Sequence, residues 1–143
     1  MKKFRLSLIV ISLTLFVSIA YAQTGTITVE ISGIQGTDGQ ISIGLYTSEE
    51  GFPETEKSYK GINMRVTGEE VVAAFQDVPA GTYAVAVFHD TNSNGKLDKN
   101  FLGIPKEGYA FSNNVFGTFG PPDFEDASFE FDGNKTVKIK MGY

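Results

Sequence analysis

The 143-residue sequence contains no cysteine and only one histidine. Without cysteine the chain has no disulfide bonds, no thiolate metal sites and no thiol redox chemistry, so its stability has to come from a packed core or from a bound ion. A single imidazole also excludes zinc sites that are built from two or three histidines. Thiol and multi-histidine chemistry are therefore excluded as functions.

The sequence also lacks an apolar run of the roughly 20 residues that span a bilayer. The longest run, residues 6–19, follows three basic residues between positions 2 and 5, and Ala20-Tyr21-Ala22 comes after it. This order is typical of a cleaved export signal, and the run is short for a retained anchor. We therefore predict a signal peptide at residues 1–22, cleavage before Gln23, and a periplasmic or extracellular protein.

Residues 23–143, the 121 residues that remain after the predicted signal, suit a single domain. Positive charge is scarce in them. Nine of the 12 Lys and Arg then stand against 17 Asp and Glu, a net charge near −8. This balance argues against nucleic acid and against anionic membrane surfaces as partners. It leaves a small ligand, a glycan or a protein.

No long segment carries a helical apolar period, and short alternating segments dominate instead. Turn residues predict that the first two of these strands form a hairpin across 36–39, and the last two a hairpin across 132–135. The pattern predicts an all-β fold, a single Greek-key β-sandwich of prealbumin-like or immunoglobulin-like type. The seven expected strands are 24–31, 39–47, 62–66, 70–75, 82–88, 128–131 and 136–141.

Residues 99–126 form a long section with almost no strand pattern and many aromatic residues. Loops of this length are either functional or disordered, and the aromatic content argues against disorder. Two interpretations stay open: the rings fold back as a lid over one open end of the sandwich, or residues 101–124 form a carbohydrate- or peptide-binding surface. In both cases we expect the rings to pack on the domain. They are Phe101, Tyr109, Phe111, Phe116, Phe119 and Phe124.

Oxygen-bearing side chains alternate along the stretch HDTNSNGKLDKN, residues 89–100. With Asp90 as position 1, Asp, Asn, Asn, Gly and Asp occupy positions 1, 3, 5, 6 and 9, which match the start of a helix-loop-helix calcium loop. Such a loop curls tightly at its glycine and directs oxygens inward. We therefore predict a Ca²⁺ site with the ligands Asp90, Asn92, Asn94, Asp98 and the carbonyl of Lys96.

The pattern departs from a paired-helix calcium domain at two points. Phe101 stands where that loop supplies a bidentate glutamate, and the segment before the loop reads as a strand. Any ion must therefore complete its shell from elsewhere. The nearest candidates are Glu107, Ser112, Asn113 and Asn114. The alternative is a plain turn, in which the Asp and Asn side chains bond their own backbone.

A catalytic interpretation finds less support. A hydrolase could use the carboxylates near Asp90, Asp98 and Glu107, and His89 could serve as a base, but no motif places a nucleophile beside them. Strand alternation also puts His89 and Asp90 on opposite faces. We expect a hydrogen-bonding role for His89 at the strand end and a protein that is not an enzyme.

Three successions carry a family likeness: GTYAVAVFHDTNSNGKLD (81–98), GIPKEGYAFSNN (103–114) and FEDASFEFDGNKTVKIKM (124–141). They resemble the exported bacterial family catalogued as domain of unknown function 2141. The resemblance implies a small exported β-sandwich without an established activity, and a site that Glu107, Ser112 and Asn113 share with the first loop. The architecture is also similar to transthyretin-like and collagen-adhesin B-type domains. The expected function is a non-enzymatic binding or structural module with a weak Ca²⁺ loop.

Overall fold

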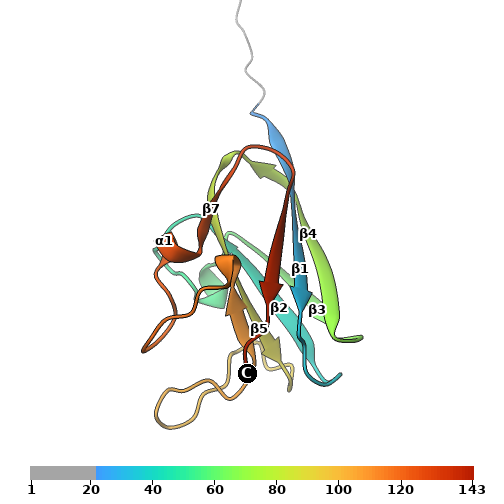
Figure 1. Ribbon diagram of the computed structural model, residues 1–143, viewed down its shortest axis with the longest axis vertical. Helices are drawn as coiled ribbons and strands as arrows, with labels where there is room; N and C mark the ends of the chain where they lie inside the picture. Colours follow the sequence, from blue (N-terminus) through green and yellow to red (C-terminus); the bar gives the residue numbers. More distant parts are fainter. Residues whose placement is uncertain (1–21) are drawn as a thin grey trace, which may run out of the picture.

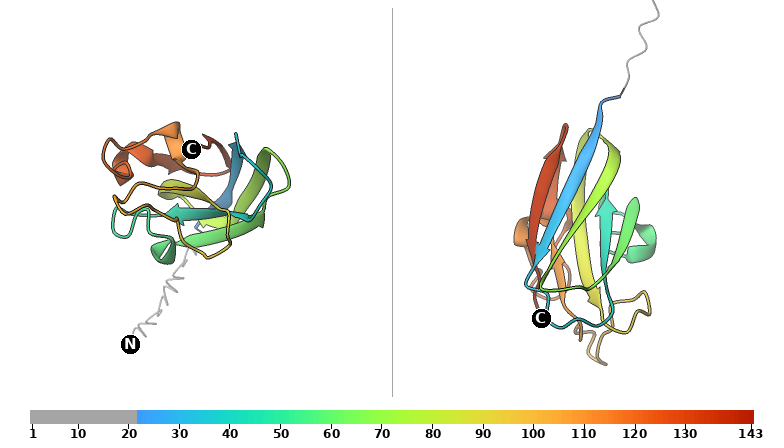
Figure 2. Two further views of the ribbon diagram at one scale, coloured as in Figure 1. Left: turned by 90° about the horizontal axis from the view of Figure 1, so that it is seen from below. Right: turned by 90° about the vertical axis from the view of Figure 1, so that its right-hand side faces the viewer.

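The computed structural model describes residues 22–143 as two β-sheets packed face to face (Figure 1, Figure 2). Residues 1–21 lie outside the described part, so the export signal and its cleavage site stay predictions. Within residues 22–143 no helix has the length and apolar character needed to cross a membrane. The all-β sandwich predicted from the alternation pattern is confirmed, with eight strands.

The first sheet has three strands in the order β4-β1-β8, and β1 and β8 run parallel. The second has the order β3-β2-β5-β6, and β7 also pairs with β5. β6 and β7 therefore follow one another along the same edge of β5. The elements are β1 (Thr24–Ser32), β2 (Gln40–Tyr46), η1 (Thr55–Lys57), β3 (Lys60–Arg65), β4 (Glu70–Pro79), β5 (Gly81–Asp90), β6 (Tyr109–Phe111), η2 (Ser112–Asn114), α1 (Phe124–Ala127), β7 (Ser128–Phe131) and β8 (Lys135–Lys140).

The main core lies between the two sheets and follows from period-2 alternation. On β1, Ile27, Val29 and Ile31 are buried, while the residues between them are more exposed. On β4 the inward set shifts from Phe75 to Val78, because an extra residue bulges at this point of the β1–β4 pairing. β1 and β4 thus turn one apolar face to the opposite sheet and a more exposed face to water.

Both predicted hairpins are wrong. β1 and β2 lie in different sheets, and so do β7 and β8. The connection between β1 and β2 holds Gly33, Gly36 and Gly39, all with positive φ, and this backbone carries the chain from one sheet to the other. Turn residues mark where a strand ends, but the sheet that the next strand joins depends on where its apolar face can be buried.

The aromatic section contains regular structure that the pattern did not predict, namely β6, η2 and α1. It does not close an open end of the sandwich. Phe111, together with Ala84 and Ala127, forms a second small core on the outer face of the five-stranded sheet, against which Phe52 and Phe124 pack. The aromatic pairs Phe52–Phe111 and Phe52–Phe124 have ring centroids 5.8 and 5.7 Å apart.

Two rings contradict the expectation that the whole section packs on the domain. Phe101 is 95% exposed and Phe119 is fully exposed. Both stand on loops that bulge away from the sheets, so no neighbouring apolar surface is available to cover them. The section therefore divides into a packed part around β6 and two projecting tips.

Candidate functional site

The loop at residues 90–98 begins with a fully buried carboxylate at the end of β5. Asp90 is 0% exposed. Its Oδ1 accepts a hydrogen bond from the backbone N–H of Asn94 (3.0 Å), and its Oδ2 accepts from the N–H of Gly95 (2.8 Å) and from Gln40 Nε2 (3.0 Å). These three donors compensate the carboxylate for its lost water and curl the loop around it.

Three of the other predicted ligands meet on the open side of the loop. Asn92 Nδ2 donates to Asp98 Oδ2 at 2.6 Å, and Asn94 Nδ2 donates to Asp98 Oδ1 at 3.0 Å. The amide oxygens face the backbone instead: Asn92 Oδ1 accepts from Asn94 N–H, and Asn94 Oδ1 accepts from Lys96 N–H. The spacing in the sequence thus does bring the side chains of Asn92, Asn94 and Asp98 together.

Glu107 closes the loop from the opposite side. It is 7% exposed, and its Oε1 accepts from both the N–H (2.9 Å) and the hydroxyl (2.7 Å) of Thr91, while its Oε2 accepts from the N–H of Asp98 (2.9 Å). One carboxylate therefore joins the two ends of the loop. Glu107 therefore lies beside the loop, as the sequence predicted, and its hydrogen bonds fix the conformation of the loop backbone.

The other predicted neighbours of the loop are elsewhere. The Ser112 hydroxyl bonds the backbone of Val85 and Ala127. Val85 precedes Asp90 by five residues on an extended strand, roughly 16 Å away. Asn113 bonds the carbonyls of Asp126 and Ser128, and Asn114 bonds the backbone of β8. The expectation that these three residues complete an ion's shell is wrong, since their polar groups hold β5, β7 and β8 together.

The potential ligand atoms of the loop are oxygens, which suit a hard cation better than a soft transition metal. Within residues 22–143 no group of three or more His, Cys, Asp or Glu forms a metal cluster. A site here would depend on two carboxylates, from Asp90 and Asp98, with amide and carbonyl oxygens, a set that suits Ca²⁺. The amides of Asn92 and Asn94 would have to turn about their last torsion, which is broad, to present oxygen instead of nitrogen.

The carboxylates do not face one another across an open cleft. Asp90 and Glu107 are buried, and each accepts three hydrogen bonds. His89, the neighbour of Asp90, is also buried: its Nδ1 lies 2.8 Å from the Tyr143 hydroxyl and its Nε2 lies 2.7 Å from the carbonyl of Asp38. The predicted hydrogen-bonding role of His89 at the strand end is confirmed.

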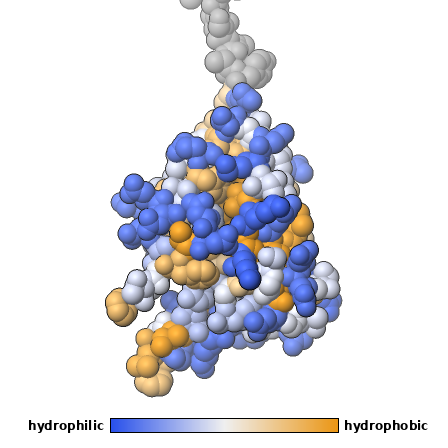
Figure 3. All heavy atoms as spheres, viewed as in Figure 1, coloured by the Kyte–Doolittle hydropathy of each residue, from blue (hydrophilic) through white to orange (hydrophobic). Residues whose placement is uncertain are grey.

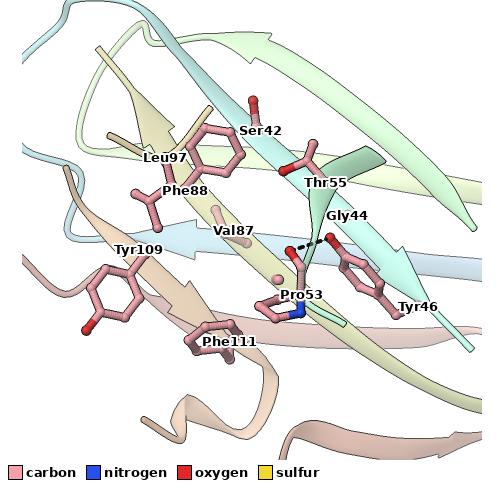
Figure 4. Close-up of a pocket in the computed structure, with 11 residues that line it drawn as sticks. Ser42, Gly44, Tyr46, Pro53, Thr55, Val87, Phe88, Leu97, Tyr109 and Phe111 are labelled. Carbon is pink, nitrogen blue, oxygen red and sulfur yellow. Dashed lines mark hydrogen bonds between the residues drawn. The ribbon is translucent and has the colours of Figure 1, made fainter. Parts of the chain in front are cut away.

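A shallow apolar pocket lies on the outer face of the five-stranded sheet (Figure 4). Gly44 and Ala86 form part of its lining, with the rings of Tyr46, Phe88 and Tyr109. Its cavity volume of about 60 Å³ holds a few water molecules. Sequence reasoning missed this face, because outward residues on a sandwich strand are expected to be polar.

Tyr46 lines the pocket, and its raised pKa predicts that the folded protein loses stability in alkaline solution. Its hydroxyl donates to the carbonyl of Pro53 at 3.0 Å (Figure 4), and burial, followed by the nearby Glu54 carboxylate, raises the pKa of Tyr46 to about 12. Because the folded pKa exceeds the unfolded value near 10, the stabilisation is complete below pH 10 and is lost as pH rises to 12.

We therefore expect the free energy of unfolding to fall by at most about 2 kcal/mol between pH 10 and 12, as the two pKa values imply. Urea unfolding at several pH values measures this fall. Tyr46→Phe removes the ionisable hydroxyl and should abolish most of the fall in unfolding free energy with pH. The part that remains comes from groups such as Tyr83, because burial raises the pKa of Tyr83 as well. A slope that is unchanged in Tyr46→Phe would contradict the assignment.

Fold and site together define a small two-sheet β-sandwich with an oxygen-rich loop at one end. Residues 29–140 match the family described as "Uncharacterized protein conserved in bacteria (DUF2141)". The match covers most of the chain, which therefore belongs to this family, and the resemblance noted in the sequence is confirmed. No curated protein and no solved structure matches the chain. The family description names no activity, so a function has to be argued from the residues themselves.

Proposed function

We propose that this protein is an exported, non-enzymatic β-sandwich module whose loop at residues 90–98 binds Ca²⁺ weakly. The observation that carries the proposal is the meeting of Asn92, Asn94 and Asp98 side chains beside the buried carboxylate of Asp90. A loop already curled by Asp90 and Glu107 needs little ordering when an ion binds, and lower ordering costs favour binding. Export is supported by the order of charged, apolar and small residues in 1–22.

Two features favour a low affinity. The loop contributes only two carboxylates, and it contains the cationic Lys96 and is followed directly by Lys99. Turning the Asn92 and Asn94 amides also breaks the four hydrogen bonds that they make, each with a net value of about 0.5–1.5 kcal/mol. We expect a Kd of roughly 10⁻⁴ to 10⁻³ M, in the range of extracellular modules.

A carbohydrate- or peptide-binding module that uses residues 101–124 is the second candidate, and it has less support. Tyr109, Phe111 and Phe124 are committed to the outer core. The pocket beside them is small, and ligand sites generally enclose most of their ligand. A hydrolase has still less support, because two of the three carboxylates considered for it, those of Asp90 and Glu107, are buried and hydrogen-bonded.

Thermal unfolding in Ca²⁺ tests the proposed site. At ten times the Kd, bound Ca²⁺ should stabilise the wild type by about 1.4 kcal/mol, a rise of several degrees in Tm. Asp98→Asn keeps the shape of the side chain but removes a charged ligand, so this variant should lose the response. Asp123→Asn, an exposed aspartate at the start of α1, is the matched control and should respond as the wild type does.

Mg²⁺ at the same concentration should give little shift, because Mg²⁺ dehydrates reluctantly and needs a tighter octahedral shell. If the wild type and Asp98→Asn show the same response to Ca²⁺, or none, the loop is only a turn. That result would sink the proposal while leaving the fold and the family unaffected.

A further inference from the structure

Residues 99–105 form a projecting structure, called here the apolar finger, directly after the loop. In Figure 1 the chain loops out beyond the lower end of the sheets, and in Figure 3 this part of the molecule carries an apolar projection. The finger exposes Phe101 (95%), Leu102 (68%) and Ile104 (55%). Three large apolar side chains on one tip are more than the scattered single residues that need no explanation.

The finger is held in shape by its own backbone. Lys99 and Pro105 form a β-bridge, and the N–H of Asn100 donates to the carbonyl of Ile104 at 2.8 Å. The Asn100 side-chain oxygen accepts from the N–H groups of Leu102 (2.9 Å) and Ile104 (3.0 Å). The apolar side chains are therefore presented outward by an internally bonded turn, with no part of the sandwich covering them.

Positive charge gathers at the base of the finger, in contrast to the rest of the chain. Lys96, Lys99 and Lys106 are exposed, and none of them forms an ion pair within the described residues. The carboxylates of Asp98 and Glu107 instead accept hydrogen bonds, Asp98 from the amides of Asn92 and Asn94, and Glu107 from the loop backbone. The net acidity of the chain argued against anionic surfaces, but residues 96–106 hold three lysines against one carboxylate, that of Asp98, which gives this stretch a net charge of +2.

We propose that the apolar finger docks on an anionic lipid bilayer. Phe101, Leu102 and Ile104 enter the interface, while the three lysines contact lipid phosphates around them, as long basic side chains do at membrane surfaces. A bilayer fits better than a protein surface because the tip is narrow and convex. Its few side chains bury a few hundred Å² at most, whereas stable protein interfaces bury about 800 Å² on each partner.

Sedimentation with vesicles tests the proposal on the chain from Gln23 onward. Phosphatidylcholine vesicles are compared with vesicles of equal parts phosphatidylcholine and phosphatidylglycerol, in chelator, so the outcome does not depend on the proposed Ca²⁺ site. The wild type should prefer the anionic vesicles, and added salt should weaken its binding. Phe101→Ser combined with Leu102→Ser should lower the partition coefficient about tenfold or more.

Removing the charges gives a separate readout. Lys99→Gln combined with Lys106→Gln should lower the binding to anionic vesicles roughly twenty-fivefold, about fivefold for each lysine, and should change little on phosphatidylcholine alone. All of these side chains are exposed, so the variants should keep the wild-type Tm. A thermal melt of each variant checks that weaker vesicle binding is not caused by unfolding.

Phe119 is the matched control, because it is fully exposed but no Lys or Arg occurs between Lys106 and Lys135. The chain has no tryptophan, so Phe101→Trp and Phe119→Trp each introduce a single reporter. The emission of Phe101→Trp should shift to the blue with anionic vesicles, and that of Phe119→Trp should not. Equal shifts in both, equal binding to neutral vesicles, or no sedimentation would overturn the proposal; the last result would leave the finger to a protein partner.

Discussion

Replacing Gly39 with alanine should lower the free energy of unfolding by about 3–4 kcal/mol, the upper part of the range for single substitutions. Gly39 has a φ of +73°, and a Cβ added there would lie 2.0 Å from the carbonyl oxygen of Asp90 and 2.6 Å from Thr91 Cα. These neighbours are backbone atoms at the end of β5, so the clash cannot be relieved by turning a side chain. The paired ends of β2 and β5 have to separate instead.

Gly36→Ala provides the matched control for this prediction. Gly36 has a similar φ of +80°, but nothing lies within 4 Å of the added Cβ. This variant should lose only the cost of a left-handed backbone conformation, about 1–2 kcal/mol. Thermal or urea unfolding of both variants measures the difference. If both variants lose the same free energy of unfolding, the close approach of Gly39 to Asp90 does not contribute to stability.

Removing the Glu107 carboxylate should cause the second large loss of stability, and the loop at residues 90–98 should be affected first. Glu107→Ala takes away three hydrogen bonds and leaves the N–H groups of Thr91 and Asp98 without their partner. We expect a loss of about 2–4 kcal/mol, because unpaired polar groups cost about 1–3 kcal/mol each and water reaches part of this loop. Hydrogen exchange at the Thr91 and Asp98 amides should accelerate more than exchange in β1, where opening requires global unfolding.

Two further variants sharpen this test. In Glu107→Gln the amide oxygen can still accept from Thr91, but the amide nitrogen faces the Asp98 N–H, so about half of the loss should appear. Glu69→Ala removes an exposed glutamate and should change stability by less than about 0.5 kcal/mol. If Glu107→Ala loses no more than Glu69→Ala, Glu107 does not hold the loop.

The oxygen-rich loop was predictable because its information is local. Alternate residues in a tight curl project to the same side, so the spacing of Asn92, Asn94 and Asp98 was enough to predict that their side chains meet. The partners that arrive from elsewhere were harder to assign. Glu107 was named as a possible ligand, and its actual contacts, with the backbone at both ends of the loop, depend on how residues 99–106 fold back.

The sequence alone determined the class of fold, the main core and the position of the loop, because period-2 alternation and turn residues act over a few positions along the chain. Only the tertiary structure decided which sheet each strand joins, as the two wrong hairpins show, since pairing depends on which apolar faces can be buried together. The tertiary structure also decided which of several chemically identical phenylalanine rings are buried. Phe111 is buried on the sheet and Phe101 stands in water, because burial depends on the surface within reach of a side chain and not on its type.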